Sequence, residues 1–222
     1  MKTALITGAS GFIGRHCLPP LLARGYAVHA VTIGPAPDSL PGVNWHSADL
    51  LDPAQVRALM AAVQPSHLLH LAWYVEHGKY WTSPDNLRWV QASLELAQAF
   101  VAAGGVRMVT AGTSAEYDWR YGWCVENLTP LAPATLYGAS KHALNIALSA
   151  YAAQIGLSAA WGRMFFLYGP GEHPARLVSS VTRALLKAEP APMSHGEQRR
   201  DFLHVADAGD AFAALLDSAV TG

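Results

Sequence analysis

A phenol and an ammonium group stand four residues apart in the segment YGASK, which begins at Tyr137 and ends at Lys141. Side chains four residues apart lie on one face of a helix. A cation beside a phenol lowers the pKa of that phenol, so Tyr137 could exchange a proton with a substrate hydroxyl or carbonyl near neutral pH. The same spacing often arises by chance, so its meaning depends on what else the chain places nearby.

A glycine-rich segment lies between the first predicted strand and the first predicted helix, at residues 7–14. Its glycines let the backbone turn sharply and approach a pyrophosphate, which the N-terminus of the following helix would stabilise. We therefore expect a dinucleotide to bind here. The expected contacts are Gly8, Ser10, Gly11, Phe12, Ile13 and Gly14. With such a site present, Tyr137 and Lys141 predict an oxidoreductase in which Lys141 also holds the nicotinamide ribose. The alternative is a tight turn without a ligand.

The end of the second predicted strand bears on the choice between NAD and NADP. Where a carboxylate would bind the adenosine ribose, eighteen residues after Gly14, the chain has Thr32. No carboxylate repels a 2′-phosphate there and no arginine follows to attract one, so we expect NAD(P) with a slight preference for NADP. Asp49 with Leu50 is a candidate adenine contact, and helix capping by Asp49 is the alternative.

The elements that must position these residues alternate between strands and helices. Strands are predicted at 4–7, 27–33, 67–72 and 107–111, and helices at 14–24, 53–63, 86–103 and 137–155. Strands separated by helices of this length favour a doubly wound, Rossmann-type parallel sheet with helices on both faces. After about residue 163 the pattern changes to a helix at 175–188, a strand at 200–205 and a helix at 207–216.

This change of pattern predicts two parts of unequal size. We expect a dinucleotide-binding Rossmann domain at 1–162. We expect a small and apparently incomplete C-terminal substrate lobe at 163–222, whose final helix returns to the first domain.

The composition excludes several classes of protein. The net charge is −1, and no run of Lys or Arg suggests a nucleic-acid or membrane surface. Two widely spaced cysteines fit a reducing compartment, and no stretch approaches the ~20 apolar residues of a membrane span, so we expect a cytoplasmic protein. Glu76 and His77 lack a third ligand at sensible spacing, so we expect no metal.

Further motifs run through the whole chain in a fixed order. They are TGASGFIG at 7–14, HLA at 70–72, GTSAEY at 112–117, YGASK at 137–141, Arg163 with YGPG at 168–171, and RRDFLHVAD at 199–207. In this order the sequence resembles the extended short-chain dehydrogenase/reductase family, in its NAD(P)-dependent nucleotide-sugar epimerase/dehydratase branch.

The resemblance implies a role for the matched residues. Tyr137 would be the acid/base, Lys141 its electrostatic helper and ribose ligand, and Thr113 would share a hydrogen bond with the substrate oxygen. Ser114 is a weaker candidate for the last role, and Thr113 could instead cap its own backbone at a strand end. The HLA motif adds cofactor contacts at Leu71 and Ala72.

On the substrate side, Arg200 resembles the family arginine that grips the diphosphate, a role that suits a fork-shaped guanidinium. The alternative is a surface ion pair with Asp201 or Asp207. Arg176 is a second candidate for contact with the nucleotide.

Two departures from the family make the sugar site more apolar. Phe166 stands where the family often has an asparagine, and the asparagine usual on the helix before GTSAEY is replaced near Trp89 or Gln91. We expect a deoxygenated or branched sugar. The aromatic stretch 73–81, beginning at Trp73, either contacts the sugar or forms a buried cluster under a loop.

In the sugar 4,6-dehydratases of this family, an Asp-Glu pair follows the hydroxyl residue and performs the elimination. This chain has Ser114 and Ala115 there, with Glu116 one place late. We therefore expect reduction, oxidation or 4-epimerisation rather than dehydration.

The two long helices at 87–103 and 137–155 are apolar on more than one side. Family members pair these helices in a dimer, so we expect a homodimer, with coverage by the chain's own loops as the alternative. Family members also continue beyond the last helix of this chain. It is either a fragment or an unusually short member, and without the remainder the sugar pocket would lack a wall.

The leading interpretation is a nucleotide-sugar 4-ketoreductase or 4-epimerase, in which Tyr137 transfers the proton at O4 while the nicotinamide transfers hydride at C4. Two alternatives stay open. One is a reductase of a small ketone or aldehyde. The other is a cofactor-binding regulatory protein or inactive truncated homologue.

Overall fold

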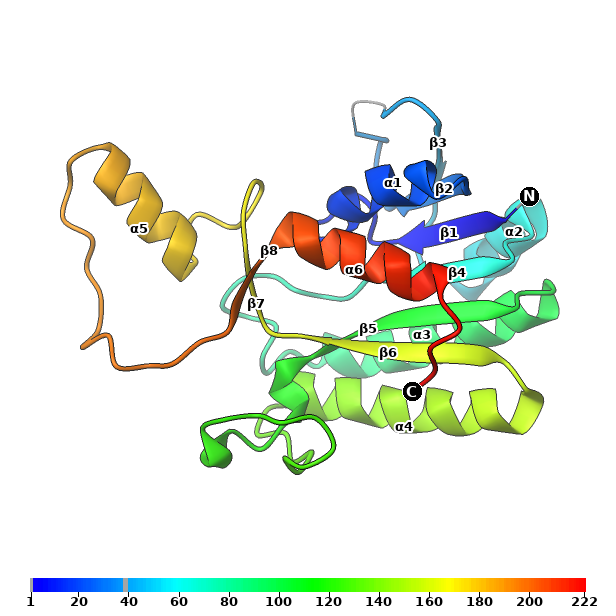
Figure 1. The fold of residues 1–222 in the computed structure, drawn as a ribbon. Coiled ribbons are helices and arrows are strands. Elements are labelled where there is room, and N and C mark those ends of the chain that lie inside the picture. Colours follow the sequence, from blue (N-terminus) through cyan, green and yellow to red (C-terminus); the bar gives the residue numbers. More distant parts are fainter. Residues whose placement is uncertain (1, 38–39) are drawn as a thin grey trace.

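The computed structural model describes residues 2–37 and 40–222. Six parallel strands form the main sheet in the order β3-β2-β1-β4-β5-β6 (Figure 1). Their bounds are β1 Thr3–Thr7, β2 Ala27–Thr32, β3 Val43–Ser47, β4 His67–His70, β5 Arg107–Thr113 and β6 Ser158–Met164. The order reverses at β1, which pairs with β2 on one side and β4 on the other. Ligands of doubly wound sheets bind beyond the carboxyl ends of the strands at such a reversal, so the order itself locates the crevice.

Helices cover both faces of this sheet. On one face α1 (Gly14–Ala23) packs beside α6 (Val205–Asp217), and on the other lie α2 (Pro53–Val63), α3 (Asp85–Ala102) and α4 (Leu136–Ile155). Successive strand residues serve opposite faces: Ile6 belongs to the core under α1 and α6, and Leu5 to the core under α3 and α4. The doubly wound Rossmann-type fold predicted from the sequence is confirmed.

The predicted bounds agree closely where a segment is strongly patterned. The helix predicted at 53–63 has those bounds, and the others differ by a few residues at their ends. We predicted no bounds for β3, β6 or the short strand β7 (Phe166–Tyr168). The edge strand β3 reads VNWHS and has no fully buried residue, and its apolar/polar alternation covers only five residues.

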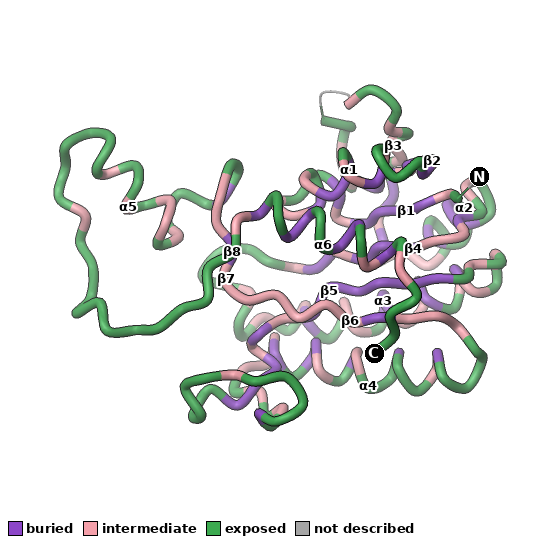
Figure 2. Tube along the Cα trace, in the orientation of Figure 1, coloured by how far each residue is buried: buried purple, intermediate pink, exposed green. Residues whose placement is uncertain are grey.

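The segment after β6 leaves the main sheet. Strand β7 pairs with β8 (Phe202–His204) in a separate two-stranded sheet, and α5 (Leu177–Leu186) lies between them in sequence. Helix α5 has no buried residue and projects away from the rest of the molecule (Figures 1 and 2). Helix α6 then returns onto α1 so closely that a Cβ at Gly209 would overlap the carbonyl of His16.

The last residue extends the main sheet rather than the lobe. Trp161 on β6 donates its backbone N–H to the carbonyl of Gly222 at 2.7 Å, and the Gly222 N–H donates to the carbonyl of Ala159 at 3.2 Å. Among the described residues, no helix combines the length and apolar character needed to cross a membrane.

Candidate active site

The glycine-rich segment after β1 forms a cradle that side chains would fill. Gly8 has φ +67°, and a Cβ there would lie 2.8 Å from the backbone nitrogen of Ala72. A Cβ on Gly14 would overlap the Gly8 carbonyl, and the Gly11 N–H donates to that same carbonyl at 3.0 Å. These glycines leave backbone N–H groups and the N-terminus of α1 open to an anion, so the segment fits the pyrophosphate of a dinucleotide.

A buried chain of polar side chains joins the ends of β1 and β4 beside the cradle. Thr7 Oγ1 accepts the backbone N–H groups of Leu71 and Ala72 at 3.2 and 3.3 Å, and lies 2.7 Å from Nδ1 of His70. His70 Nε2 lies 2.9 Å from Ser93 Oγ.

The hydrogen-bond directions in this chain assign the tautomer of His70. The Ser93 hydroxyl donates to the carbonyl of Trp89 at 2.6 Å, so Ser93 must accept from Nε2 of His70 and Thr7 must donate to Nδ1. Burial, with repulsion from Lys141, lowers the pKa of His70 to about 3, so the ring is neutral. We predicted that the HLA motif contacts the cofactor, but we did not predict the hydrogen bonds of Thr7, His70 and Ser93 that hold this motif in place. The sequence signal for these hydrogen bonds was a threonine and a histidine at the ends of two neighbouring strands.

The other predicted cofactor contacts lie at the ends of β2 and β3. Thr32 is half-buried, and its hydroxyl accepts the N–H of Gly34 at 3.4 Å. Asp49 accepts the N–H of Leu51 at 2.9 Å, whereas the cap of α2 is Asp52, which accepts from Ala54. The alternative in which Asp49 caps the helix is therefore wrong.

Helix α4 brings its first turn against the end of β5. Thr135 caps the helix by accepting the N–H of Gly138 at 3.1 Å, and a Cβ on Gly138 would overlap the Ala115 carbonyl. This close approach sets Tyr137 beside Thr113, whose side chain interacts with the phenol. Thr113 also caps the short helix η1 (Ser114–Glu116), because its Oγ1 accepts the N–H of Ala115 at 3.2 Å.

The pKa of Tyr137 is raised, to about 12, chiefly because the phenol is desolvated by burial. Thr113 acts in the opposite direction, and Tyr80 adds to the rise. The net shift of the Tyr137 pKa is therefore opposite in direction to the lowering predicted from the sequence. A phenol with this pKa is protonated at neutral pH and can donate its proton.

Lys141 is buried against backbone and indole instead. Its Nζ donates to the carbonyl of Ala111 at 3.0 Å and lies 3.9 Å from the centroid of a Trp73 ring. Desolvation lowers the pKa of Lys141 to about 7, although the nearby Glu116 opposes the shift. The ammonium is therefore poised between its charged and neutral forms near physiological pH.

The aromatic stretch 73–81 splits between the two alternatives considered for it. Trp73 is buried and donates from Nε1 to Asn86 at 2.8 Å, which fits the buried cluster. Tyr80 and Trp81 meet the Tyr137 ring edge-on, with centroids 4.9 and 5.7 Å away, so they pack against the candidate acid/base. Within the described residues, no group of three His, Cys, Asp or Glu side chains could hold a metal ion.

The two predicted substrate arginines occupy different places. Burial raises the pKa of both Tyr137 and Tyr80, and Arg176, just before α5, lies close enough for its charge to oppose that rise. Arg200 is exposed, with its guanidinium carbon 5.1 Å from the centroid of Phe166. Among the described residues it forms no ion pair, so the alternative pairing with Asp201 or Asp207 is wrong.

Arg200 borders a cavity of about 550 Å³ between the segment after η1 and the end of β6. Aromatic rings and guanidinium groups dominate its lining. These include Tyr117, Trp119, Trp123, Phe165, Arg163 and Arg199. Ser114 is buried beside this region, and its carbonyl accepts the indole N–H of Trp119 at 2.9 Å.

The YGPG loop reaches across the crevice. Pro170 lies with its carbonyl 3.2 Å from Nε2 of His16, next to the glycine cradle. Further along, His173 stacks on His77 with ring centroids 4.3 Å apart. The loop thus joins the cradle to the aromatic stretch, a link between distant segments that no local pattern predicts.

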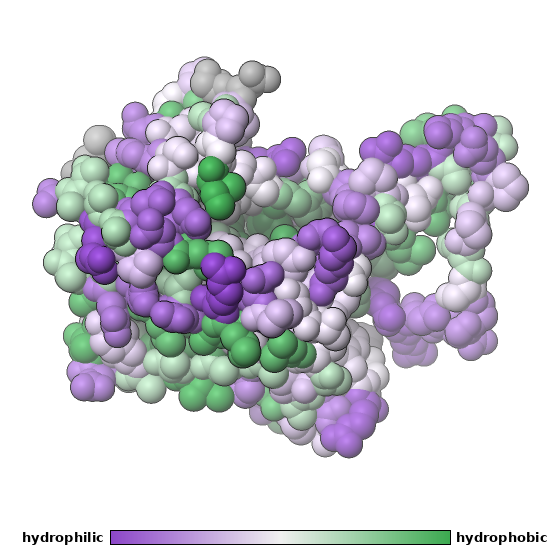
Figure 3. Space-filling view, turned by 180° about the vertical axis from the view of Figure 1, so that it is seen from behind, coloured by the Kyte–Doolittle hydropathy of each residue, from purple (hydrophilic) through white to green (hydrophobic). Residues whose placement is uncertain are grey.

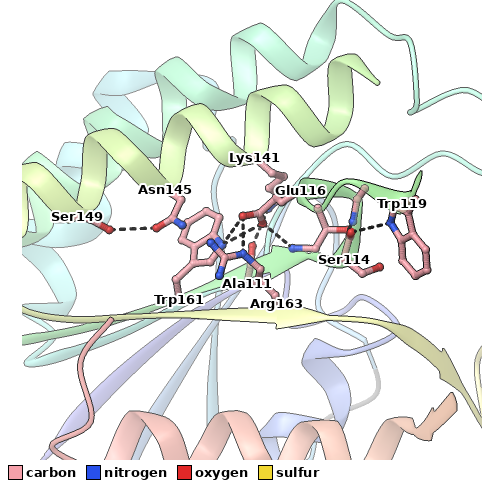
Figure 4. A network of polar contacts seen from close by, with 11 residues as sticks. Ala111, Ser114, Glu116, Trp119, Lys141, Asn145, Ser149, Trp161 and Arg163 are labelled. Atoms are coloured by element: carbon pink, nitrogen blue, oxygen red, sulfur yellow. Dashed lines mark hydrogen bonds and ion pairs between the residues drawn. The ribbon is translucent and has the colours of Figure 1, made fainter. Parts of the chain in front are cut away.

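A completely buried carboxylate lies under the end of β5. Glu116 accepts the backbone N–H of Thr113 at 2.8 Å and the indole N–H of Trp161 at 3.0 Å, and it pairs with Nε of Arg163 at 2.8 Å (Figure 4). From the sequence, Glu116 stood out only as displaced from a dehydratase position. The available signal was the capping-box spacing Thr-x-x-Glu, which the structure forms in full.

Comparison with known proteins agrees with this geometry. Residues 4–222 match the sequence model of the NAD dependent epimerase/dehydratase family. The chain belongs to this family. It is an enzyme family whose name covers more than one reaction, so membership alone does not select among them.

Individual relatives share about three quarters of their length with this chain. A dTDP-6-deoxy-L-talose 4-dehydrogenase (NAD(+)) from Aggregatibacter actinomycetemcomitans is 29% identical over 91% of this chain and 76% of its own. The crystal structure of a UDP-glucose 4-epimerase from Thermus thermophilus with NAD is 28% identical, with a TM-score of 0.84, and covers 99% and 76% of the two chains. MoeE5 in complex with UDP-glucuronic acid and NAD is 34% identical, with a TM-score of 0.81 and coverage of 97% and 72%.

These relatives bear on the cofactor. The family is NAD-dependent, and both solved relatives described above carry NAD. The preference for NADP predicted from Thr32 gains no support.

Proposed function

We propose that the protein is an NAD(H)-dependent oxidoreductase or epimerase acting at C4 of a nucleotide-linked deoxysugar. NAD, when bound, supplies or accepts the hydride at that carbon. Tyr137 gives a proton to the sugar O4 when the ketone is reduced and takes it back when the alcohol is oxidised. Thr113 donates a hydrogen bond to the same oxygen, and Lys141 binds the nicotinamide ribose. The observation that carries the proposal is the placement of Tyr137 against Thr113 at the end of β5, with Lys141 one turn further along α4 at the Ala111 carbonyl of the same strand.

The cradle and the strand ends would hold the cofactor. Overlap at Gly8 and Gly14 excludes side chains where the pyrophosphate would bind. The adenosine end would reach Thr32, Asp49 and Leu50, and the nicotinamide end would reach Leu71, Ala72 and Lys141. Arg15 supports this segment, because its guanidinium donates to the carbonyls of Ser10 and Gly11 at 3.1 Å each.

Residues 163–222 would serve as a partial substrate lobe beside the Rossmann domain at 1–162. Arg176 would bind the substrate near the Tyr137 phenol. Arg200, together with Phe166, would bind the diphosphate. Ser114 would lie at the inner side of the sugar site, and Trp73 would support it from the buried cluster, where it packs against Asn86 and Lys141. The apolar Phe166 supports a deoxygenated sugar, and the talose derivative named for one relative is a deoxysugar linked to a nucleotide.

Dehydration is not part of the proposed reaction. Elimination needs an acid and a base next to the hydroxyl residue, and Ser114 and Ala115 supply neither. The following carboxylate, on Glu116, already accepts from Thr113 and Trp161 and pairs with Arg163. Because its oxygens already serve these donors, the carboxylate of Glu116 is not free to remove a sugar proton.

The experiment that tests the function combines trapped ligands with turnover. Small molecules released from the purified protein are identified by mass spectrometry, and the protein is then incubated with NAD and dTDP- or UDP-linked hexoses. We expect an epimer or a 4-keto sugar in the unmodified protein and neither in Y137F. A 4-keto-6-deoxy product from a 6-hydroxylated sugar would contradict the proposal by showing dehydration. NAD binding without turnover of any sugar would favour the regulatory alternative.

The outer faces of α3 and α4 support a homodimer. Leu87 and Ile146 expose 59% and 58% of their surface, and small residues including Ala143, Ala147 and Ala150 surround Ile146. Seen from behind, hydrophobic side chains gather over the lower part of the molecule, where these helices lie (Figure 3). Static light scattering at micromolar concentration should give twice the mass of one chain, and I146E should give a monomer. A monomeric unmodified protein would overturn this assembly.

A further inference from the structure

The end of β5 is held from two sides by opposite charges. Lys141 on α4 donates to the carbonyl of Ala111, and Glu116 on η1 accepts the N–H of Thr113, two residues further along the same strand. Gly112 between them is required, because a Cβ there would lie 2.7 Å from Oε1 of Glu116 and would overlap the indole of Trp161. Both charged groups lie inside the protein, with Glu116 fully buried and Lys141 3% exposed (Figure 4).

We propose that Glu116 is a positioning residue of the reaction, whose buried carboxylate fixes the strand end that carries Thr113 and sustains the positive charge of Lys141. The inference rests on the proposed function, since it adds a member to the same site. It does not make Glu116 a catalytic residue, because the carboxylate reaches Thr113 through the backbone and reaches Lys141 through space.

The positional part follows from the hydrogen bonds. Three donors from three residues converge on one carboxylate: the Thr113 backbone at the end of β5, and the Trp161 indole and Arg163 guanidinium on β6. Charge-assisted bonds of this kind are short and directional. The side chain of Arg163 is only 18% exposed, so water competes little for the pair. Moving the carboxylate would therefore move the backbone from which the Thr113 hydroxyl projects.

The electrostatic part follows from what surrounds Lys141. Among the described residues, the titratable groups that interact with its ammonium are Glu116 from η1 and neutral His70 from β4, and Arg163 lies behind Glu116. Glu116 is the anion of this set. It opposes the desolvation that lowers the pKa of Lys141 to about 7. Without that anion, Lys141 would lose its proton at lower pH.

Two substitutions separate charge from position. E116Q keeps one oxygen for the Thr113 and Trp161 donors but removes the charge and the acceptor for Arg163 Nε, whereas E116D keeps the charge but withdraws it from the strand end. The carboxylate of Glu95 on α3, whose hydrogen bond with Gln91 is exposed and which lies outside the lining of the cavity beside Arg200, supplies the matched control, E95Q. The chain has four lysines, so the ε-carbon of Lys141 can be followed by NMR in protein labelled with ¹³C-lysine.

In E116Q we expect the Lys141 titration to move to lower pH by about one unit or more. In E116D we expect kcat to fall about 10- to 100-fold, the range for a small misplacement at a reacting centre, with the Kd for NAD nearly unchanged. E95Q should match the unmodified protein in both measurements. An unchanged Lys141 titration in E116Q would overturn the electrostatic part, and an unchanged kcat in E116D would overturn the positional part.

A measurement on the unmodified protein keeps the inference falsifiable if the variants do not fold. The carboxyl carbon of Glu116 should show a step in its chemical shift at the pH where Lys141 loses its proton, because the two charges interact. No step there would overturn the inference. These titrations need no sugar substrate, so they remain informative if the proposed reaction fails, and loss of turnover in Y137F with no effect of Glu116 would leave the proposed function standing.

Discussion

The strand ends around Tyr137 and the segment between β7 and β8 that carries α5 differ in burial and in hydrogen bonding. At the strand ends, Thr7, His70, Ser93, Glu116 and Lys141 are buried and their polar atoms have partners. Helix α5 has no buried residue, and Leu185 and Leu186 expose 67% and 82% of their surface. Packing and hydrogen bonds therefore determine where the chemistry occurs, while little within the described residues determines where the substrate lobe lies. The first region suits fixed geometry, and the second suits binding of a variable ligand.

The largest expected effect is a loss of catalysis without a change in the packing of the strand ends. Y137F removes the proton donor but keeps the ring that packs against Tyr80 and Trp81. We expect kcat to fall by about 10³-fold or more, within the range for loss of an acid/base group, while the Kd for NAD stays within a few-fold. Steady-state rates and fluorescence titration with NADH measure both. A variant with near-normal turnover would remove Tyr137 from the mechanism.

Equal truncations in the two regions should have unequal effects on stability. Leu144 on α4 is fully buried, so L144A should lower the free energy of unfolding by about 2–5 kcal/mol. L186A on α5 removes the same atoms from an exposed site and should change it by less than about 0.5 kcal/mol. Urea denaturation followed by circular dichroism gives both values. Similar losses in the two variants would show that α5 is packed in solution.

Low pH should lower the free energy of unfolding through His70. Its pKa is lowered in the folded protein to about 3, whereas an unfolded histidine titrates near 6.5. Between these values the unfolded chain binds the extra proton, so the free energy of unfolding falls as pH decreases, by up to ~1.4 kcal/mol per pH unit for this one group. Denaturation curves between pH 4 and 7 should show a steeper decline for the unmodified protein than for H70Q. Parallel declines would mean that His70 is not buried as described.

The smallest of these effects belongs to the exposed region. R200L removes a guanidinium that stacks on Phe166. This guanidinium does not contact the buried polar residues at the strand ends. We expect the KM for the nucleotide sugar to rise about 10-fold, with kcat and NAD affinity little changed, since one charge-assisted contact is worth ~1.5–3 kcal/mol. R57L, at an exposed arginine on α2 away from this cavity, is the matched control. A loss of kcat in R200L with no change in KM would place Arg200 outside substrate binding.

The local pattern of the sequence was sufficient for the fold and for naming the residues that we propose for the chemistry. The alternation of strand and helix, the glycine spacing at 8, 11 and 14, and the pair Tyr137 and Lys141 are local features, because each depends on backbone geometry over a few residues. Left-handed glycines at the ends of α1, α3 and α4 belong to the same class: Gly25, Gly104 and Gly156 have φ of +79°, +87° and +73°.

Only the tertiary structure decided how these residues behave. The pKa of Tyr137 is raised rather than lowered, Lys141 lies on Trp73, and Glu116 binds the end of β5. Each of these results depends on desolvation and on partners far away in the sequence, such as Arg163 for Glu116. Spacing along a helix gives the distance between two side chains, but the energy of a charge depends on everything packed around it.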